Sequence, residues 1–410
     1  MRDLTDRNGL LSRRDLLAGG AGLLVAAPAA SADALPPSMT RPGAGFGVYG
    51  QPSPHERHTA RAIAANRDLP GNGVSWTPLQ DLEGIITPSG LHFERHHSGI
   101  PDIDPMLHRL VLQGRVGKPL VWTMAELLRY PRVSRQLFIE CGGNSNSLWN
   151  AAPRQTSAGA LHGLASCSEW TGVPLRLLLE EAGVADGATW LIAEGADAGG
   201  LHLSIPMQKA LDDCLLALWQ NGERLRPEQG YPLRLLVPGW EGVTHVKWLH
   251  RLESAEAPAM SRYETGRYTD LLADGSARQF SFVIEPKSVI TNPSPGQLLR
   301  AHGTYQISGL AWSGRGAVRR VDVSADGGKT WVPAALEGPV QRQCFTRFRA
   351  AWQWRGQPAR LKSRCTDDTG ATQPERIALL SERGRHSEFH FNGIVCWAVD
   401  EEGEVSHVYA

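Results

Sequence analysis

The chain has 410 residues, more than one ordinary hydrophobic core accommodates, so we expect two domains with room for a third. Hydrophobic residues make up 41% and charged residues 20% of it, the balance of a soluble globular protein. Lysine plus arginine and aspartate plus glutamate both number 42, which excludes the strong overall charge of proteins that bind nucleic acids or anionic membrane surfaces. We therefore expect no nucleic-acid partner, and a bound anion has to be held by a few cations that gather locally.

Residues 1–32 are predicted to be a twin-arginine signal peptide. Residues 12–17 have the sequence SRRDLL, an apolar run follows, and residues 30–32 have the small side chains of a cleavage site. The apolar run is short and rich in glycine and alanine, so we expect no membrane span in the mature protein. The mature chain is then expected to begin near Asp33 and to work in the periplasm; the alternative is a basic amphipathic N-terminus.

The six cysteines show no CxxC spacing, which argues against a zinc ribbon, a redox dithiol or a c-type haem attachment site. They are Cys141, Cys167, Cys214, Cys344, Cys365 and Cys396. An oxidising compartment would permit one or two disulfides, but the spacing does not say which cysteines would pair.

Residues 33–70 are polar and rich in proline and glycine, and we expect an extended arm there. The turn-rich segment 91–104 follows, with Arg95, His96 and His97 next to one another. By composition alone, these three side chains favour a solvated surface cluster.

Two helices and a strand are predicted in the next part of the chain. Thr123 and Glu126 form a capping-box pattern for a short helix, and a second helix is expected between Pro174 and Gly183. Between them, an apolar run leads into Cys141, which two glycines follow directly. This pattern predicts a buried strand with a thiol at its end, beside backbone that a bulky group can approach. The alternative is a buried core cysteine.

Short apolar runs separated by glycine and proline continue at residues 189–197, 201–211, 230–242 and 244–253. They predict a mixed α+β layer, and the absence of a GxGxxG or Walker sequence argues against a dinucleotide or ATP partner. Residues 254–280 lack periodicity, so we expect a long functional loop or an interdomain crossing there.

After Pro286 the sequence alternates with period two. Alternation at residues 304–312, 318–324 and 345–354, with a hairpin at residues 326–328, predicts an immunoglobulin-like β-sandwich. We place the domain boundary near residue 287.

Taken in order, these motifs resemble the sulfite oxidase family of molybdenum enzymes, over nearly all of the mature chain. The matching segments are FERHH at 93–97, CGGN at 141–144, SIPMQKA at 204–210, the run 221–249, SADGGKTW at 324–331 and the Arg-Gly pair at 383–384. Within the family, the run RPEQGYPLRLLVPGWEG and the lack of a haem domain are most similar to the molybdenum subunits of Sox-type sulfane dehydrogenases.

The resemblance implies an α+β fold in which a mixed molybdopterin-binding catalytic domain, residues 33–286, precedes an immunoglobulin-like dimerisation domain, residues 287–410. It also implies a molybdenum–molybdopterin cofactor with Cys141 as the metal ligand, and a thiolate suits a thiophilic metal.

The remaining site residues are carried over from the family in the same way. Arg234 and Lys247 suit the pterin phosphate, one as a bidentate fork and the other as a point charge. The alternative for Arg234 and Lys247 is a pair of ordinary surface cations. The alternative for the histidines is a buried core position with satisfied hydrogen bonds. The implied cofactor-binding residues are Phe93, His96, His97, Asp197, Gln229, Arg234, His245, Val246 and Lys247.

On the substrate side the resemblance implies Arg95 and Arg383, one from each domain, and the active-site tyrosine Tyr268, with Tyr263 as the neighbouring alternative. Two positions depart from the sulfite-oxidising members, which have an arginine where this chain has Asn146 and a histidine where it has Gln229. A substrate site with fewer cations favours the binding of a larger substrate over that of the small sulfite dianion.

We therefore expect a molybdopterin-dependent sulfite or sulfane dehydrogenase that oxidises reduced sulfur by oxo transfer. Its expected substrate is sulfane sulfur on a carrier protein or a related sulfur oxyanion, and its expected acceptor is a c-type cytochrome on another chain, in a homodimer or heterotetramer. The alternatives are a free-sulfite dehydrogenase and, from another class, an exported binding protein without enzymatic activity.

Overall fold

The computed structural model describes residues 10–11, 39, 41–42 and 44–409. The twin-arginine motif and the expected cleavage site lie outside the described residues. Within the described part of the chain, no helix combines the length and the apolar character needed to cross a membrane.

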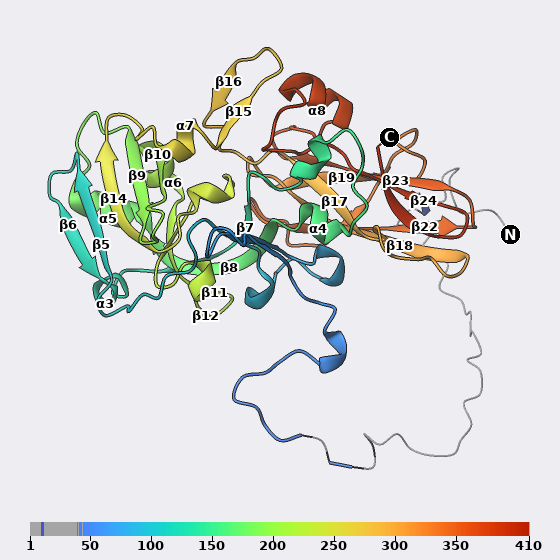
Figure 1. The fold of residues 1–410 in the computed structure, drawn as a ribbon, viewed down its shortest axis with the longest axis horizontal. Coiled ribbons are helices and arrows are strands. Elements are labelled where there is room, and N and C mark those ends of the chain that lie inside the picture. The colour runs from blue at the N-terminus through green and yellow to red at the C-terminus, as the bar shows by residue number, and fades with distance from the viewer. Residues whose placement is uncertain (1–9, 12–38, 40, 43, 410) are drawn as a thin grey trace.

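The N-terminal part contains a five-stranded sheet that lies farthest from the C-terminal part (Figure 1). Its strand order is β10-β9-β14-β5-β6, and only the β14–β5 pair is parallel. Alternating burial along β5 matches its period-two pattern, because one face packs on a core. The strands are β5 (Arg109–Gly114), β6 (Leu120–Thr123), β9 (Trp190–Gly195), β10 (His202–Pro206) and β14 (Leu249–Ala255).

A second five-stranded sheet lies between the first sheet and the C-terminal part, and β7 forms one of its edges. Its strands run β12-β11-β8-β7, with β13 paired to β11. A small sheet, β2-β3-β4, brings residues 94–96 to the same region. These strands are β7 (Val133–Glu140), β8 (Ala165–Pro174), β11 (Leu215–Gln220), β12 (Glu223–Arg224), β13 (Arg234–Leu236), β2 (Ala62–Ala65), β3 (Gly73–Trp76) and β4 (Glu94–His96).

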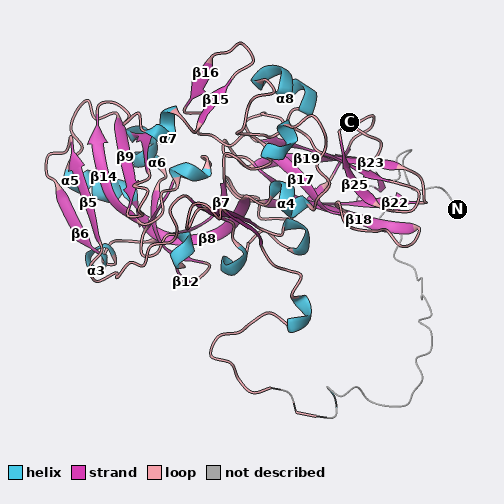
Figure 2. Ribbon diagram, in the orientation of Figure 1, coloured by secondary structure: helices cyan, strands magenta, loops and turns pink. Residues whose placement is uncertain are grey.

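The helices are short and lie around the sheets (Figure 2). The predicted capping box is present: Thr123 and Glu126 exchange hydrogen bonds at the start of α3. The second predicted helix is α5, which Gly183 ends in the left-handed conformation. The helices are α3 (Met124–Leu127), α4 (Ala158–His162), α5 (Leu175–Ala182), α6 (Met207–Asp212), α7 (Arg262–Thr265) and α8 (Arg376–Arg383).

The segment 254–280, predicted to be a long functional loop or an interdomain crossing, leads from β14 toward the sandwich and contains short regular elements. A capping box between Ser261 and Glu264 starts α7, and the antiparallel strands β15 (Thr269–Leu271) and β16 (Ala277–Gln279) form a hairpin. Gly275 takes a positive φ of 84° in the turn between these strands. The segment carries Tyr268 at the base of this hairpin, so the residue sits on ordered structure.

The C-terminal part is the predicted β-sandwich. One sheet has the order β1-β22-β18-β17 with β21 paired to β22, and the other has the order β20-β19-β23-β24-β25. The predicted hairpin joins β19 to β20, where Val323 pairs with Val332. The strands are β1 (Leu10–Leu11), β17 (Lys287–Asn292), β18 (Gly303–Trp312), β19 (Val318–Ser324), β20 (Val332–Pro333), β21 (Ala335–Leu336), β22 (Thr346–Trp354), β23 (Ala359–Asp367), β24 (Cys396–Val399) and β25 (Val405–Val408).

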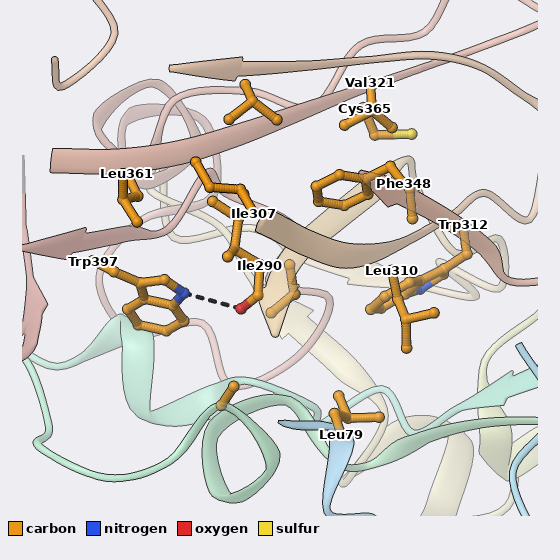
Figure 3. Close-up of a cluster of buried hydrophobic side chains, with 14 of the residues drawn as sticks. Leu79, Ile290, Ile307, Leu310, Trp312, Val321, Phe348, Leu361, Cys365 and Trp397 are labelled. Carbon is orange, nitrogen blue, oxygen red and sulfur yellow. Dashed lines mark hydrogen bonds between the residues drawn. The ribbon is translucent and has the colours of Figure 1, made fainter. Parts of the chain in front are cut away.

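The hydrophobic core of the sandwich continues into the N-terminal part. Figure 3 shows Phe348 and Trp312 on opposite faces of one sheet of the sandwich, and Trp397 donating a hydrogen bond of 3.0 Å to the backbone oxygen of Ile290. The same cluster of buried side chains includes Leu79 and Phe138 from the N-terminal part. β17, the strand that follows the predicted domain boundary, begins at Lys287. Because the hydrophobic core continues across this point, the domain boundary near residue 287 stays a prediction.

We expect Phe138→Ala to lower the free energy of unfolding of the whole chain by about 3–5 kcal/mol, because it leaves a cavity in the shared core. Phe138 is fully buried and stacks on Phe345, with ring centroids 6.2 Å apart. Denaturant titration measures the change, and Val121→Ala, at a side chain that is 59% exposed, serves as the control. Two separate unfolding transitions, only one of them shifted by Phe138→Ala, would contradict a shared core.

Candidate active site

Most of the predicted site residues line one cavity, between the second sheet, β4 and the turn before β14. About 680 Å³ of space that protein atoms do not fill lies there, part of it open to solvent. The lining residues are Phe93, Arg95, His96, His97, Cys141, Asp197, Leu201, Gln229, Arg234, Gly242, Val243, His245, Lys247, Trp248 and Tyr268.

Cys141 directly follows the last residue of β7 and lines the cavity. Its amide donates a hydrogen bond of 2.9 Å to the oxygen of Leu164, and its own oxygen accepts one of 2.8 Å from Asn144. A side chain at Gly142 would place a Cβ 2.8 Å from the Glu241 carboxylate, so the Glu241 side chain would have to shift to admit one. Burial raises the pKa of the Cys141 thiol, so a bond to a metal would be needed to hold it as the thiolate.

A buried ion pair lies directly behind Cys141. Lys287, on the first strand of the sandwich, contacts the Glu140 carboxylate at 2.8 Å, and both side chains are almost completely buried. The carboxylate also accepts hydrogen bonds from Asn144 (2.8 Å) and Trp312 (2.6 Å), and Lys287 donates a further one to Ser145 (2.8 Å). The network therefore ties both sides of the cysteine turn to the sandwich.

Arg234 and Lys247 bring positive charge to the cavity, next to Arg95. The Arg234 guanidinium donates to the Gln229 side-chain oxygen at 3.0 Å, and its Nε atom is buried without a hydrogen-bond partner. Lys247 donates to the Arg95 oxygen at 3.2 Å and contacts His96 Nδ1 at 2.8 Å. Among the residues that the structure describes, no carboxylate forms an ion pair with any of these three cations.

The environment disfavours the charged forms of Arg234 and Lys247 when no anion is present. Burial lowers the pKa of Arg234 to about 9. Burial, followed by repulsion from Arg234, lowers the pKa of Lys247. An anion in the cavity would offset both effects. The orphaned Arg234 Nε and the excess of buried positive charge therefore fit the phosphate of molybdopterin.

His96 and His97 are neutral at pH 7 in this environment. Burial and the charge of Lys247 lower the pKa of His96 to about 3, and burial and Arg95 lower that of His97 to about 4. His96 Nε2 contacts Glu94 at 2.8 Å, whereas the His97 ring packs against Tyr263 at 5.4 Å. These rings can orient a cofactor by hydrogen bonds but add no charge.

His245 is also neutral, with its pKa lowered to about 3 by burial and then by Arg234. Its Nδ1 atom accepts from the amide of Val237 at 3.3 Å, and its Nε2 atom lies 3.1 Å from the oxygen of Trp240. Both ring nitrogens thus have partners in the backbone that forms the cavity wall. His245 shapes the wall around the cofactor cavity.

Tyr268 lines the cavity and Tyr263 does not. The Tyr268 ring lies 5.3 Å from that of Phe389, which comes from the C-terminal part. Burial, and then the proximity of Cys141, raise the pKa of Tyr268, so its hydroxyl keeps its proton and can donate a hydrogen bond. This geometry favours Tyr268 over its neighbour as the active-site tyrosine.

Arg383 and Val246 do not line the cavity. Arg383 lies at the end of α8, beside the β15–β16 hairpin (Figure 1), and its guanidinium contacts the buried Asp270 carboxylate at 3.2 Å. Val246 is buried in the core beneath the wall that His245 and Lys247 form. Asp197 and Gln229 do line the cavity, and Gln229 donates to the Phe93 oxygen at 3.1 Å.

The sequence reasoning missed Trp248 in the wall and the partners of the cysteine turn. Trp248 adopts a positive φ of 54°, and Lys247 lies 4.4 Å over its ring. No motif of the sequence signals that backbone conformation. Glu140 did carry a signal: a carboxylate at the end of an apolar strand needs a buried partner. Its partner, Lys287, lies in the other domain and could not be identified from spacing.

Two family models match the chain. Residues 97–263 match the family described as "Oxidoreductase molybdopterin binding domain", and residues 278–396 match the "Mo-co oxidoreductase dimerisation domain". The chain is 33% identical to mitochondrial sulfite oxidase of Mus musculus, over 78% of this chain and 63% of the relative. It is 31% identical to sulfite oxidase of Gallus gallus, over 72% of this chain and 70% of that one.

Among solved structures, the fold is similar to the sulfane dehydrogenase SoxCD from Paracoccus pantotrophus. The TM-score is 0.89 and the sequence identity 44%, over 92% of this chain and 97% of that one. The two chains therefore share the fold almost from end to end.

We expect Lys287→Met to lower the free energy of unfolding by about 3–5 kcal/mol, because it leaves the buried Glu140 carboxylate without its counter-charge. Removing both charges, with Lys287→Met and Glu140→Gln together, should recover part of this loss. Arg176→Met is the matched control, because the Arg176–Glu180 pair is more than half exposed and should contribute less than about 1 kcal/mol. Denaturant titration measures the free energy of unfolding of all three variants; equal effects of Lys287→Met and Arg176→Met would refute the buried-pair assignment.

Proposed function

Because the chain belongs to the sulfite oxidase family of molybdenum enzymes, we propose that it oxidises reduced sulfur with molybdenum–molybdopterin as its cofactor. The bound cofactor supplies the oxo group that is transferred to sulfur and takes up two electrons. The observation that carries the proposal is the cavity itself, which Cys141 lines together with three cations, Arg95, Arg234 and Lys247. Among the described residues, no carboxylate forms an ion pair with any of these cations.

The position of each residue in the cavity then indicates its role in the proposed reaction. Cys141 would hold the metal, and Arg234 and Lys247 would hold the cofactor phosphate by charge-assisted hydrogen bonds. Arg95 would bind and orient an anionic sulfur substrate, and Tyr268 would hold a proton near the reacting atoms. Phe389 packs beside Tyr268 and helps to exclude water there.

For the substrate, we propose sulfane sulfur on a carrier protein in preference to free sulfite. Asn146 is exposed and neutral, and the Gln229 amide is engaged by Phe93 and Arg234. Arg383 is held by Asp270, which removes one more cation from the cavity. A site that lacks these further cations binds a small dianion less tightly than one that has them, and the likeness to a sulfane dehydrogenase supports the same choice.

We further propose that electrons leave to a c-type cytochrome on another chain, since no c-type haem attachment sequence is present. The C-terminal part matches a dimerisation domain, so we propose that it mediates a homodimer or part of a heterotetramer. The SRRDLL sequence supports export to the periplasm. A free-sulfite dehydrogenase remains the second candidate, favoured by the curated sulfite oxidases.

We expect kcat/KM for a carrier-bound persulfide to exceed that for sulfite by at least about 10-fold, because sulfite lacks one charge-assisted hydrogen bond here. Steady-state rates with cytochrome c as the acceptor measure both. Asn146→Arg should raise the value for sulfite selectively. Higher efficiency with sulfite in the unaltered enzyme would favour the free-sulfite dehydrogenase.

We expect Cys141→Ser to lower kcat by more than about 1000-fold while the chain stays folded, because it removes the proposed metal ligand. Arg95→Met should raise KM for an anionic substrate by about 10- to 100-fold, and Arg109→Met, at an exposed arginine, is the control. Metal analysis of the purified protein accompanies the kinetics. A folded protein with molybdenum near zero would support the exported binding protein instead.

A further inference from the structure

Two cysteines that the proposed reaction does not use meet at the junction of the two parts of the chain. Cys167 lies on β8 of the N-terminal part, and Cys344 lies just before β22 of the sandwich. Their sulfur atoms are 3.5 Å apart, although the residues are 177 positions apart in the sequence. Both side chains are essentially fully buried, at 0% and 1% exposure.

The backbone holds both residues in this arrangement. Cys167 pairs with Phe138 across β7 and β8, and its oxygen accepts a hydrogen bond of 2.7 Å from the amide of Thr87. On the other side, the Phe138 amide donates a bond of 3.0 Å to the oxygen of Gln343. Gln343, the residue before Cys344, is thus held against β7, the strand that pairs with β8 at Cys167.

We propose that Cys167 and Cys344 form a disulfide that covalently joins the two parts of the chain when the protein is oxidised. A disulfide needs the sulfurs at about 2.05 Å. Cys167 lies in the middle of a strand, whereas Cys344 lies in a bend outside regular structure. The competing interpretation is a permanent S–H···S contact between two reduced core thiols.

The oxidant must be small, because the thiols are buried, and hydrogen peroxide meets this need. The contact between the two sulfur atoms allows either thiol to donate a hydrogen bond to the thiolate of the other, and we take Cys344 as the first nucleophile. Its thiolate attacks one peroxide oxygen, the O–O bond breaks, and a sulfenic acid and water result. The Cys167 sulfur then displaces the hydroxyl group, and the second water leaves with the Cys167 proton. In sum, two thiols lose two electrons and two protons, and the peroxide becomes two waters.

This bond would restrain the strand next to the proposed metal ligand. β8 pairs with β7, which ends directly before Cys141, and the bond would fix β8 to the sandwich. A disulfide that closes a loop of this length strongly lowers the conformational entropy of the unfolded chain. The oxidised protein should therefore unfold at a higher temperature. The proposal does not depend on the substrate, and its failure would leave the proposed reaction untouched.

The test uses the full-length holoenzyme with and without hydrogen peroxide. After unfolding in an alkylating agent and digestion without reductant, we expect a cross-linked peptide pair containing Cys167 and Cys344. The midpoint of thermal unfolding should rise by about 5 °C on oxidation and return with dithiothreitol. Cys344→Ala should abolish the cross-link and the shift, and Cys365→Ala, at another fully buried cysteine, should keep both.

Oxidation of Met106, which is 78% exposed, shows that the peroxide acted on the sample. If Met106 becomes a sulfoxide while Cys167 and Cys344 are both recovered as alkylated thiols, the proposal is wrong. A thermal shift that persists in Cys344→Ala would likewise overturn it, because the stabilisation would then come from another oxidation. If Cys344→Ala fails to fold, the peptide pair in the unaltered chain still decides the question.

Discussion

The site depends on the buried ion pair between Glu140 and Lys287. The carboxylate precedes the proposed metal ligand in the chain, and the ammonium group stands at the first residue of the sandwich. Two such charges are costly to bury unless further hydrogen bonds satisfy them, and Asn144, Ser145 and Trp312 do so here. The position of the Cys141 turn is therefore set by two parts of the fold at once.

The cavity in front of this turn has the opposite character. Its arginines and lysine lack carboxylate partners among the described residues, and its histidines are neutral. Charge that is left without a partner lowers the stability of the empty protein, but it gives an anionic cofactor a site that needs little rearrangement. The protein thus gains affinity for the cofactor at the expense of its own stability without it.

Much of this could be predicted from the sequence, because local patterns determine it. The capping box at Thr123, the apolar strand before Cys141 and the alternating strands after residue 303 depend on neighbouring residues. The motif residues that line the cavity were identified through resemblance, since chain spacing alone does not bring Phe93 to Lys247. The ordered segment around Tyr268 was missed because its strands are only three residues long, too short to show periodicity. The ion pair of Arg383 with Asp270 joins distant segments, and no local pattern reports such a contact.

The shared core has a consequence for the order in which the protein matures. Phe138 and Leu79 are covered by side chains that are synthesised long after them, at the end of the chain. Until the sandwich strands have been synthesised and have folded, these side chains lack their partners and Glu140 lacks its counter-charge. The turn that presents Cys141 therefore reaches its final surroundings late in the synthesis of the chain.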